Sequence, residues 1–415
     1  GLIPDADSWW MPRTGSASPP LGRSSEVNAQ TREDAMADYP CVELGPIAHG
    51  GHCVARLDGR VVFVRYGIPG ERVRVRSTDD SKPRMWWGEV AEVIEASPDR
   101  VIPPCPVAGR CGGCDFQHVA VPRQRELKAQ VLAEQLRRLA GLEIDVTVEP
   151  VPGDADGLGW RTRMRYLVRD HRVGLRAWRS DELVELPVGG CRIAHPGGPA
   201  DLGRFAGHDG ELQVVISDDG CTVLGPGGEL LTGSQIVTQH VGGRAYRVRA
   251  DGFWQVHPGA AETLTAAVLD GLNPKAGEQV ADLYCGCGLF AGALVDAGCR
   301  VTGIEASRSA IELAKINVPQ ARFHAMRVDK AGSRLAKKTD LIVLDPPRTG
   351  AGAGVVRQLA GLEPTGIAYV ACDPAALARD LATFATCGYR LESLRAFDLF
   401  PMTHHMECVA VLRPH

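Results

Sequence analysis

Two residues late in the chain, Cys372 and Glu407, have side chains suited to covalent catalysis. Cys372 follows the apolar run 368–371 and precedes Asp373-Pro374, so we expect it at a strand end beside a helix N-terminus, which lowers a thiol pKa. Glu407 opens the last apolar run, 408–412, where a buried carboxylate is costly without a task or partner. A nucleophile and a general base are the predicted roles, against a plain buried cysteine as the alternative.

A small-residue turn at 284–288 follows a predicted strand and opens a predicted helix, as in many cofactor sites. Gly286, Gly288 and Ala291 satisfy a dinucleotide-binding pattern, and Glu305 ends the next strand, so a nicotinamide-dependent oxidoreductase is a rival interpretation. Asp282, just before the turn, would repel a pyrophosphate but not a sulfonium. The turn therefore favours S-adenosylmethionine.

A thiol and a carboxylate beside a methyl donor fit one reaction in particular, methylation of uracil at C5. Because C5 is a poor nucleophile, a thiolate first adds to C6, C5 then takes the methyl group, and a base removes the C5 proton. The run Asp345-Pro346-Pro347-Arg348 points the same way, since methyltransferases acting on base amines place an aromatic residue where Arg348 stands. Pro346-Pro347 merely ending a strand is the structural alternative.

Three cysteines, Cys105, Cys111 and Cys114, share one Gly/Pro-rich loop with the spacing C-x5-C-x2-C. Zinc sites usually pair two C-x2-C arms, and only one is present, so three local thiols and a distant fourth suit an iron-sulfur cluster better. Cys191 is the best candidate for the fourth ligand. An odd total of 13 cysteines also fits a reducing compartment rather than a disulfide framework.

The length of 415 residues allows two to three domains, and the patterns divide it into four ranges. We expect a disordered tail or leader at 1–38 and a small OB-like β-barrel at 39–100, where Asp58-Gly59 marks a two-residue hairpin. A central α+β domain at 101–250 holds the cysteine loop. Strands alternating with helices predict a doubly wound, Rossmann-like α/β domain at 251–415.

The net charge of −4 means that any RNA site must be a local basic patch. Arg161, Arg163 and Arg165 alternate within an arginine-rich stretch at 160–180, which predicts a phosphate-binding stripe on one face of a strand. A flipped-out uridine would be held by apolar groups such as Phe253 or Trp254. No apolar run is long enough for a membrane span, so we expect a cytoplasmic monomer that works on RNA without membrane contact.

These motifs, taken in order, resemble the bacterial RNA 5-methyluridine (uracil-C5) methyltransferases. The likeness covers about residues 41–412 and is closest to the iron-sulfur 23S ribosomal RNA branch with an N-terminal TRAM domain. The motifs on which the resemblance rests include 111–114 with Gln117-His118, 253–255, 282–286, 345–348, 372–374 and 400–407. The resemblance implies S-adenosylmethionine and a 4Fe-4S cluster as cofactors. It also implies cluster ligands Cys105, Cys111, Cys114 and Cys191, nucleophile Cys372, base Glu407 and cofactor contacts Gln255, Tyr284, Glu305 and Asp345.

The sequence departs from the family pattern at Asp373, where Asn is usual, at His257, again in place of Asn, and at Leu289, where a cofactor-contacting Asn is expected. These changes put cofactor geometry and substrate preference in question more than the reaction type. The same chemistry on the T-loop of transfer RNA stays open, as does a non-catalytic RNA-binding protein.

Overall fold

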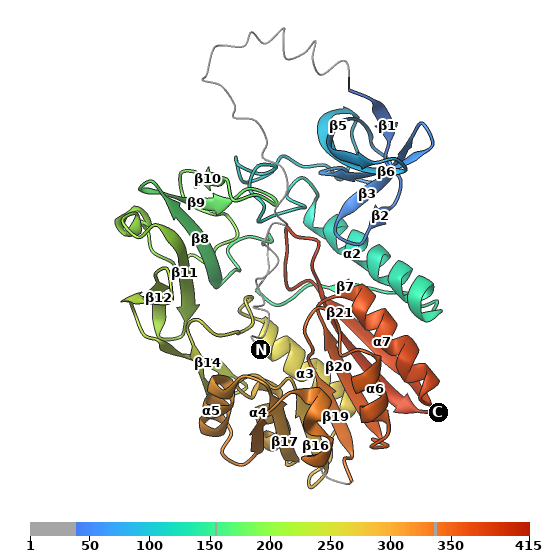
Figure 1. The fold of residues 1–415 in the computed structure, drawn as a ribbon, viewed down its shortest axis with the longest axis vertical. Coiled ribbons are helices and arrows are strands. Elements are labelled where there is room, and N and C mark those ends of the chain that lie inside the picture. The colour runs from blue at the N-terminus through green and yellow to red at the C-terminus, as the bar shows by residue number, and fades with distance from the viewer. Residues whose placement is uncertain (1–38, 154–155, 336–337) are drawn as a thin grey trace.

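The computed structural model describes residues 39–153, 156–335 and 338–415, and the predicted tail at 1–38 lies outside the described residues. The N-terminal part is a coiled sheet in the strand order β1-β5-β6-β4-β3-β2 around an apolar core (Figure 1). The hairpin is confirmed, because Leu57 pairs with Arg60 across Asp58 and Gly59, whose φ angles are 48° and 77°. The strands are β1 (Cys41–Glu43), β2 (Ile47–Ala48), β3 (His52–Leu57), β4 (Arg60–Arg65), β5 (Arg72–Lys82) and β6 (Met85–Glu95).

The middle of the chain combines a long helix with a second sheet (Figure 1). The predicted helix at 121–140 is present as α2 (Val121–Gln135), which continues into a π-helical turn, η2 (Leu136–Ala140). An antiparallel sheet follows in the order β10-β9-β8-β11-β12-β13, beside the hairpin β14-β15. Its elements are β8 (Arg163–Arg169), β9 (Arg172–Arg176), β10 (Leu183–Glu185), η3 (Gly203–Phe205), β11 (Gly210–Ser217), β12 (Gly220–Leu224), β13 (Leu230–Thr232), β14 (Ile236–Val241) and β15 (Arg244–Arg249).

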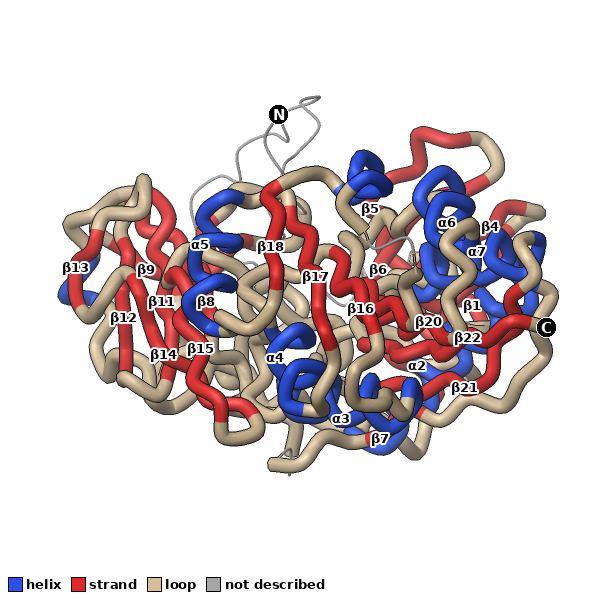
Figure 2. Tube along the Cα trace, turned by 90° about the horizontal axis from the view of Figure 1, so that it is seen from below, coloured by secondary structure: helices blue, strands red, loops and turns tan. Residues whose placement is uncertain are grey.

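The C-terminal part forms one large sheet in the order β18-β17-β16-β19-β20-β22-β21-β7 (Figure 2). Pairing is parallel from β18 to β20, and β22 then runs antiparallel between β20 and β21. This is a Rossmann-like sheet with antiparallel strands near one edge. The alternation of strand and helix patterns in the sequence predicted its mainly parallel part. Its strands are β7 (Val148–Glu149), β16 (Gln279–Leu283), β17 (Arg300–Glu305), β18 (Arg322–Ala325), β19 (Leu341–Leu344), β20 (Gly366–Ala371), β21 (Tyr389–Phe397) and β22 (Glu407–Pro414).

Both faces of the central strands β19 and β20 are covered, and these two strands are buried along their whole length. Val343 packs with α3, α4 and α5 on one face, whereas Ile342 and Leu344 pack with α2, α6 and α7 on the other. Polar side chains can therefore reach a ligand only beyond the strand ends. The covering elements are α3 (Ala260–Leu272), α4 (Leu289–Asp296), α5 (Arg308–Asn317), η4 (Val328–Ser333), α6 (Ala353–Ala360) and α7 (Pro374–Thr386).

Two elements from the predicted central range, α2 and β7, belong to the packing of the C-terminal sheet. The α2 helix contacts α7, and β7 adds a strand beside β21. The N-terminal and C-terminal parts therefore meet around α2. None of the helices within the described ranges has the length and hydrophobicity needed to span a membrane.

Candidate active site

Strand register brings the predicted reactive pair together. Strands β20 and β22 are antiparallel neighbours, and their last pair joins Ala371 to Cys408. Cys372 directly follows β20 and Glu407 is the first residue of β22, so both residues adjoin this last pair at one edge of the sheet. The Glu407 side chain is only 5% exposed, and its charge is among those that raise the pKa of Cys372.

Burial sets the protonation of this pair. It raises the pKa of Glu407 well above the usual range, and the neighbouring carboxylate of Asp345 adds to the rise. Burial also raises the pKa of the Cys372 thiol, again with a contribution from Glu407. Arg348 opposes both shifts, because a nearby positive charge favours the ionised forms. The arginine after Asp345-Pro346-Pro347 is therefore an electrostatic partner of both groups.

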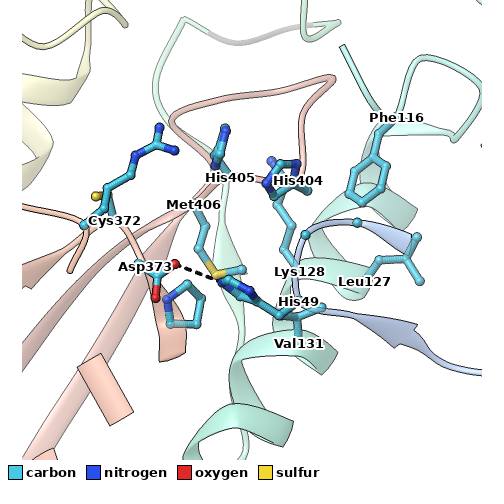
Figure 3. Close-up of a pocket in the computed structure, with 14 residues that line it drawn as sticks. His49, Phe116, Leu127, Lys128, Val131, Cys372, Asp373, His404, His405 and Met406 are labelled. Atoms are coloured by element: carbon cyan, nitrogen blue, oxygen red, sulfur yellow. Dashed lines mark hydrogen bonds and ion pairs between the residues drawn. The ribbon is translucent and has the colours of Figure 1, made fainter. Parts of the chain in front are cut away.

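A cavity of about 460 Å³, partly open to solvent, lies against Cys372 (Figure 3). Its wall combines the N-terminal sheet, α2 and the loop before β22 with the segment that carries the cysteine. Basic side chains predominate among the polar residues of the wall. They are His49, Lys128, Arg348, His404 and His405, beside the single carboxylate of Asp373. The charge of Lys128 is balanced by buried Asp398 at 2.5 Å, and burial holds the pKa of His405 well below its usual value, so these two residues add no net positive charge to the wall.

The small-residue turn has the geometry expected of a cofactor site. Tyr284, Gly286 and Gly288 have φ angles of 60°, 52° and 93°, which bend the chain sharply between β16 and α4. Asp282 is fully buried and accepts a hydrogen bond from the Ala291 amide at 2.8 Å, so it anchors the start of α4. Burial raises the pKa of Asp282 to about 8. Its expected repulsion of a pyrophosphate is therefore a weak argument, because the group is largely neutral near pH 7.

Three of the four predicted cofactor contacts lie side by side. Tyr284, Glu305 and Asp345 follow or end the neighbouring strands β16, β17 and β19 at their carboxyl ends. Glu305 accepts a hydrogen bond from the Ser307 amide at 2.7 Å and raises the pKa of Asp345, which burial lifts to about 7. The fourth, Gln255, is buried in the segment between β15 and α3.

The cysteine loop brings its thiols together with Cys191. Cys105, Cys111 and Cys114 are buried, and Cys191 packs against the cluster that contains Cys114. The Cys111 sulfur accepts a hydrogen bond from the Gly113 amide at 3.4 Å, and burial raises the pKa of Cys111 to about 11. In the described parts of the chain, however, no group of three or more His, Cys, Asp or Glu side chains is arranged to hold a metal ion.

The predicted phosphate-binding stripe is wrong for part of its length. Arg163 turns inward and donates to the carbonyl oxygens of Ala250 and Gly252, while Arg165 pairs with Glu211 at 3.2 Å. Arg176 pairs with the same carboxylate. Alternation put these arginines on one face, but it could not reveal the carboxylate on the adjacent strand.

The two aromatic residues proposed to hold a flipped base differ sharply in exposure. Trp254 is 6% exposed and packs against Tyr246 at a ring distance of 5.6 Å, so it belongs to the core. Phe253 is 63% exposed and stays available for stacking. Hydropathy alone does not separate two neighbouring aromatic residues.

Comparisons with known proteins fit this geometry. A family model described as tRNA (Uracil-5-)-methyltransferase matches residues 331–414, and one described as Methyltransferase small domain matches 260–370. A protein of Streptomyces avermitilis named "Uncharacterized RNA methyltransferase" is 46% identical over 90% of this chain and 98% of its own. The 23S rRNA (uracil(1939)-C(5))-methyltransferase RlmD of Chromohalobacter salexigens is 33% identical over 97% of this chain and 96% of its own. The chain belongs to the RNA uracil-C5 methyltransferase family.

As a member of this family, the protein is an S-adenosylmethionine-dependent RNA (uracil-C5)-methyltransferase. The nicotinamide-dependent oxidoreductase and the non-catalytic RNA-binding protein are thereby set aside. The fold agrees: the tRNA (uracil-54, C5)-methyltransferase of Pyrococcus abyssi, solved with S-adenosyl-L-homocysteine, superposes with a TM-score of 0.71 at 22% identity. That superposition covers 90% of this chain and all of the other.

Several residues that line or brace this methyltransferase's pocket were missed by sequence reasoning. His49 binds Asp373 at 2.9 Å, and Asp115 binds His404 at 2.6 Å and Arg65 at 3.0 Å. The partners are separated by 324, 289 and 50 residues. His404 lies within the motif at 400–407 on which the family resemblance rests, but no local sequence pattern links these residues to their partners.

Proposed function

We propose that the enzyme makes 5-methyluridine by covalent catalysis, with Cys372 as nucleophile and Glu407 as general base. The observation that carries this proposal is the β20–β22 register, which places the two residues beside its last pair, Ala371 and Cys408. The pair lies at the same sheet edge as the small-residue turn and beside a cavity with a basic wall. A thiol, a base, a methyl-donor site and a polyanion-compatible cavity then meet at one place.

The reaction follows from the chemistry of the two groups. The Cys372 thiolate forms a bond to uracil C6, which shifts electron density to C5, and C5 bonds to the methyl group. S-Adenosylmethionine, when bound, would supply that methyl group from its sulfonium sulfur, with the S–CH₃ bond broken and S-adenosylhomocysteine as the leaving group. The Glu407 carboxylate takes the C5 proton, the S–C6 bond breaks and the ring double bond returns. Arg348 stabilises the thiolate, since its charge favours the ionised form.

We assign the donor site to Tyr284, Glu305, Asp345 and Gln255. A carboxylate at the end of the second strand is suited to ribose hydroxyls, as in other open α/β sheets. At Gly286, an added Cβ would meet no atom within 4 Å, so the turn has open space beside it. Carboxylates at this edge also suit a ligand that carries positive charge.

We further propose that Cys105, Cys111, Cys114 and Cys191 hold a 4Fe-4S cluster and that the N-terminal sheet is a TRAM domain. The packing of Cys191 against the cluster that contains Cys114, and an amide hydrogen bond to the Cys111 sulfur, fit the ligand chemistry of such clusters. Each thiolate of a cube binds a different iron, so the sulfurs need not surround one point as zinc ligands do. Protein purified without oxygen should be brown and contain about four irons per chain. A colourless protein with one zinc would contradict the cluster.

The proposed substrate is 23S ribosomal RNA. The full-length likeness to a protein named for that substrate supports it. Transfer RNA is the second candidate, because the superposed archaeal structure is named for uracil 54 of tRNA. In either case we propose that the enzyme works in the cytoplasm.

One experiment tests reaction and substrate together. Undermethylated 23S rRNA fragments and tRNA are incubated separately with the enzyme and labelled S-adenosylmethionine, digested, and mapped by mass spectrometry. We expect label at C5 of one uridine in the rRNA. Label found only in the T-loop of tRNA would make tRNA the substrate in place of 23S rRNA. Label on another atom or base would contradict the proposed reaction.

A further inference from the structure

A turn of the N-terminal sheet reaches the segment that carries Cys372. His49, between β2 and β3, places its Nε2 2.9 Å from one carboxylate oxygen of Asp373 (Figure 3). The other oxygen of Asp373 accepts a hydrogen bond from the Ala376 amide at 2.7 Å and caps α7. A residue adjacent to the proposed nucleophile is thus bound simultaneously to its own helix and to a distant sheet.

This turn is packed too tightly to shift independently. Gly51 has a φ of 79°, and a Cβ added there would lie 2.8 Å from the Cβ of His404 and 3.3 Å from a ring carbon of Phe116. Only glycine fits both the backbone angle and the space. The turn is therefore in close contact with the loop before β22 and with the cysteine loop.

A second tie joins the same parts. Arg65 of β4 binds one oxygen of Asp115 at 3.0 Å, and His404 binds the other at 2.6 Å. Asp115 directly follows Cys114 in the cysteine loop. The N-terminal sheet is consequently fastened on both sides of the cavity, at His404 and at Asp373.

We propose that His49 is a positioning residue, which holds Asp373 and through it fixes the Cys372 backbone for attack on the uracil ring. The inference rests on the proposed role of Cys372. It also accounts for the departure at 373: an asparagine could still cap α7, but its second group would be an amide N–H₂, which can only donate to an unprotonated Nε2 and carries no charge to hold a protonated imidazole. The aspartate supplies an acceptor for each task. The N-terminal sheet then helps to position the catalytic centre.

The test is a double-mutant cycle on the full-length enzyme with H49A, D373S and the double variant. D373S keeps an oxygen that can cap α7, but this one short side-chain oxygen cannot reach both the Ala376 amide and His49. We expect each single variant to lower kcat about five- to tenfold with less than a twofold change in RNA Kd, because a displaced nucleophile slows chemistry rather than binding. The double variant should be no slower than either single variant, since both changes break the same contact.

Two further variants sharpen the test. H49Q keeps a donor toward Asp373 and should recover at least half of the lost kcat. His240 forms a comparable but exposed contact with Asp218 at 2.7 Å on β14, and H240A should leave kcat unchanged. Melting temperatures of all variants should stay within about 3 °C of the parent, because a single ion pair that includes a partly exposed histidine contributes little to stability.

Each other outcome overturns the inference. A rise in RNA Kd with unchanged kcat makes His49 a direct RNA contact. Additive losses in the double variant, or losses that track the melting temperature and are not rescued by H49Q, give it a structural role. C372A, assayed in parallel, distinguishes a failure of this inference from a failure of the proposed function. If C372A still turns over, the proposed function itself fails, whatever the double-mutant cycle shows.

Discussion

Cys372 lies between two regions of different side-chain chemistry. On one side, Asp282, Glu305 and Asp345 lie at the carboxyl ends of β16, β17 and β19, and Glu407 begins β22 at the same edge of the sheet. On the other, the cavity wall carries histidine, lysine and arginine side chains from four separate segments of the chain. The acidic region is built from strands of one sheet, three of them parallel, whereas the basic region is assembled from segments far apart in the chain.

The difference matches the two substrates of the reaction. Burial and mutual repulsion raise the pKa of Asp345 to about 7 and that of Glu407 well above its usual range, and a bound sulfonium would lower both. A basic wall suits a polyanion such as RNA. The acidic region lacks the positive charge that the sulfonium brings, and the basic region lacks the negative charge that the RNA brings. The Cys372 thiol lies between the two regions, where the two substrates would meet.

The largest effect should come from removing the sulfur at the junction of the two regions. C372A should lower methyl transfer by at least about 10³-fold, because no other group can add to C6. RNA binding should persist, since the basic wall is unchanged. Filter binding and labelled-methyl transfer measure the two quantities. C387A, at the far end of α7, is the matched control and should remain active.

The acidic region is tested next by E407Q. Turnover should fall by about 10²- to 10⁴-fold, because the C5 proton has no acceptor, while addition of Cys372 and methyl transfer can still occur. A covalent enzyme–RNA complex should therefore accumulate and appear as a slow band on a denaturing gel. E392Q, on exposed β21, should form no such band. Loss of turnover without an adduct would assign Glu407 to an earlier step.

The basic region is tested by Arg348. R348M should raise the pKa of Cys372 further, because the positive charge that lowers it is gone. The rising limb of the pH profile of kcat/KM should move upward by about one pH unit, with about tenfold lower activity at pH 7. R348K, which keeps the charge, should shift the limb less. An unchanged profile would mean that Arg348 does not act on the thiol.

The sequence predicted the acidic region far better than the basic one, for a physical reason. Parallel strands bring their carboxyl ends to one edge, so Tyr284, Glu305 and Asp345 could be grouped from strand order alone. The two apolar runs at 368–371 and 408–412 predicted the strands β20 and β22, but their antiparallel register is known only from the structure. His49 and Asp115 lie in turns whose partners are hundreds of residues away, and only the packing of the N-terminal sheet onto α2 and the loop before β22 brings them together.

The smallest effect on turnover is expected from D282N, because Asp282 faces α4 rather than the cavity. This variant instead tests how much stability the protein loses by burying a carboxylate in the acidic region. Burial raises its pKa from 3.8 to about 8, so the folded state binds a proton that the unfolded state releases between these values. Wild-type stability is thus lost as the pH rises through this window. In D282N the amide oxygen can still accept from Ala291, but no charge has to be buried. Its unfolding free energy relative to the parent should therefore grow by about 2 to 4 kcal/mol between pH 5 and pH 8. Urea unfolding of both proteins at the two pH values measures this difference. If the difference in unfolding free energy between D282N and the parent were the same at both pH values, Asp282 would be ionised in the folded protein, and the acidic region would carry its charge without a methyl donor bound.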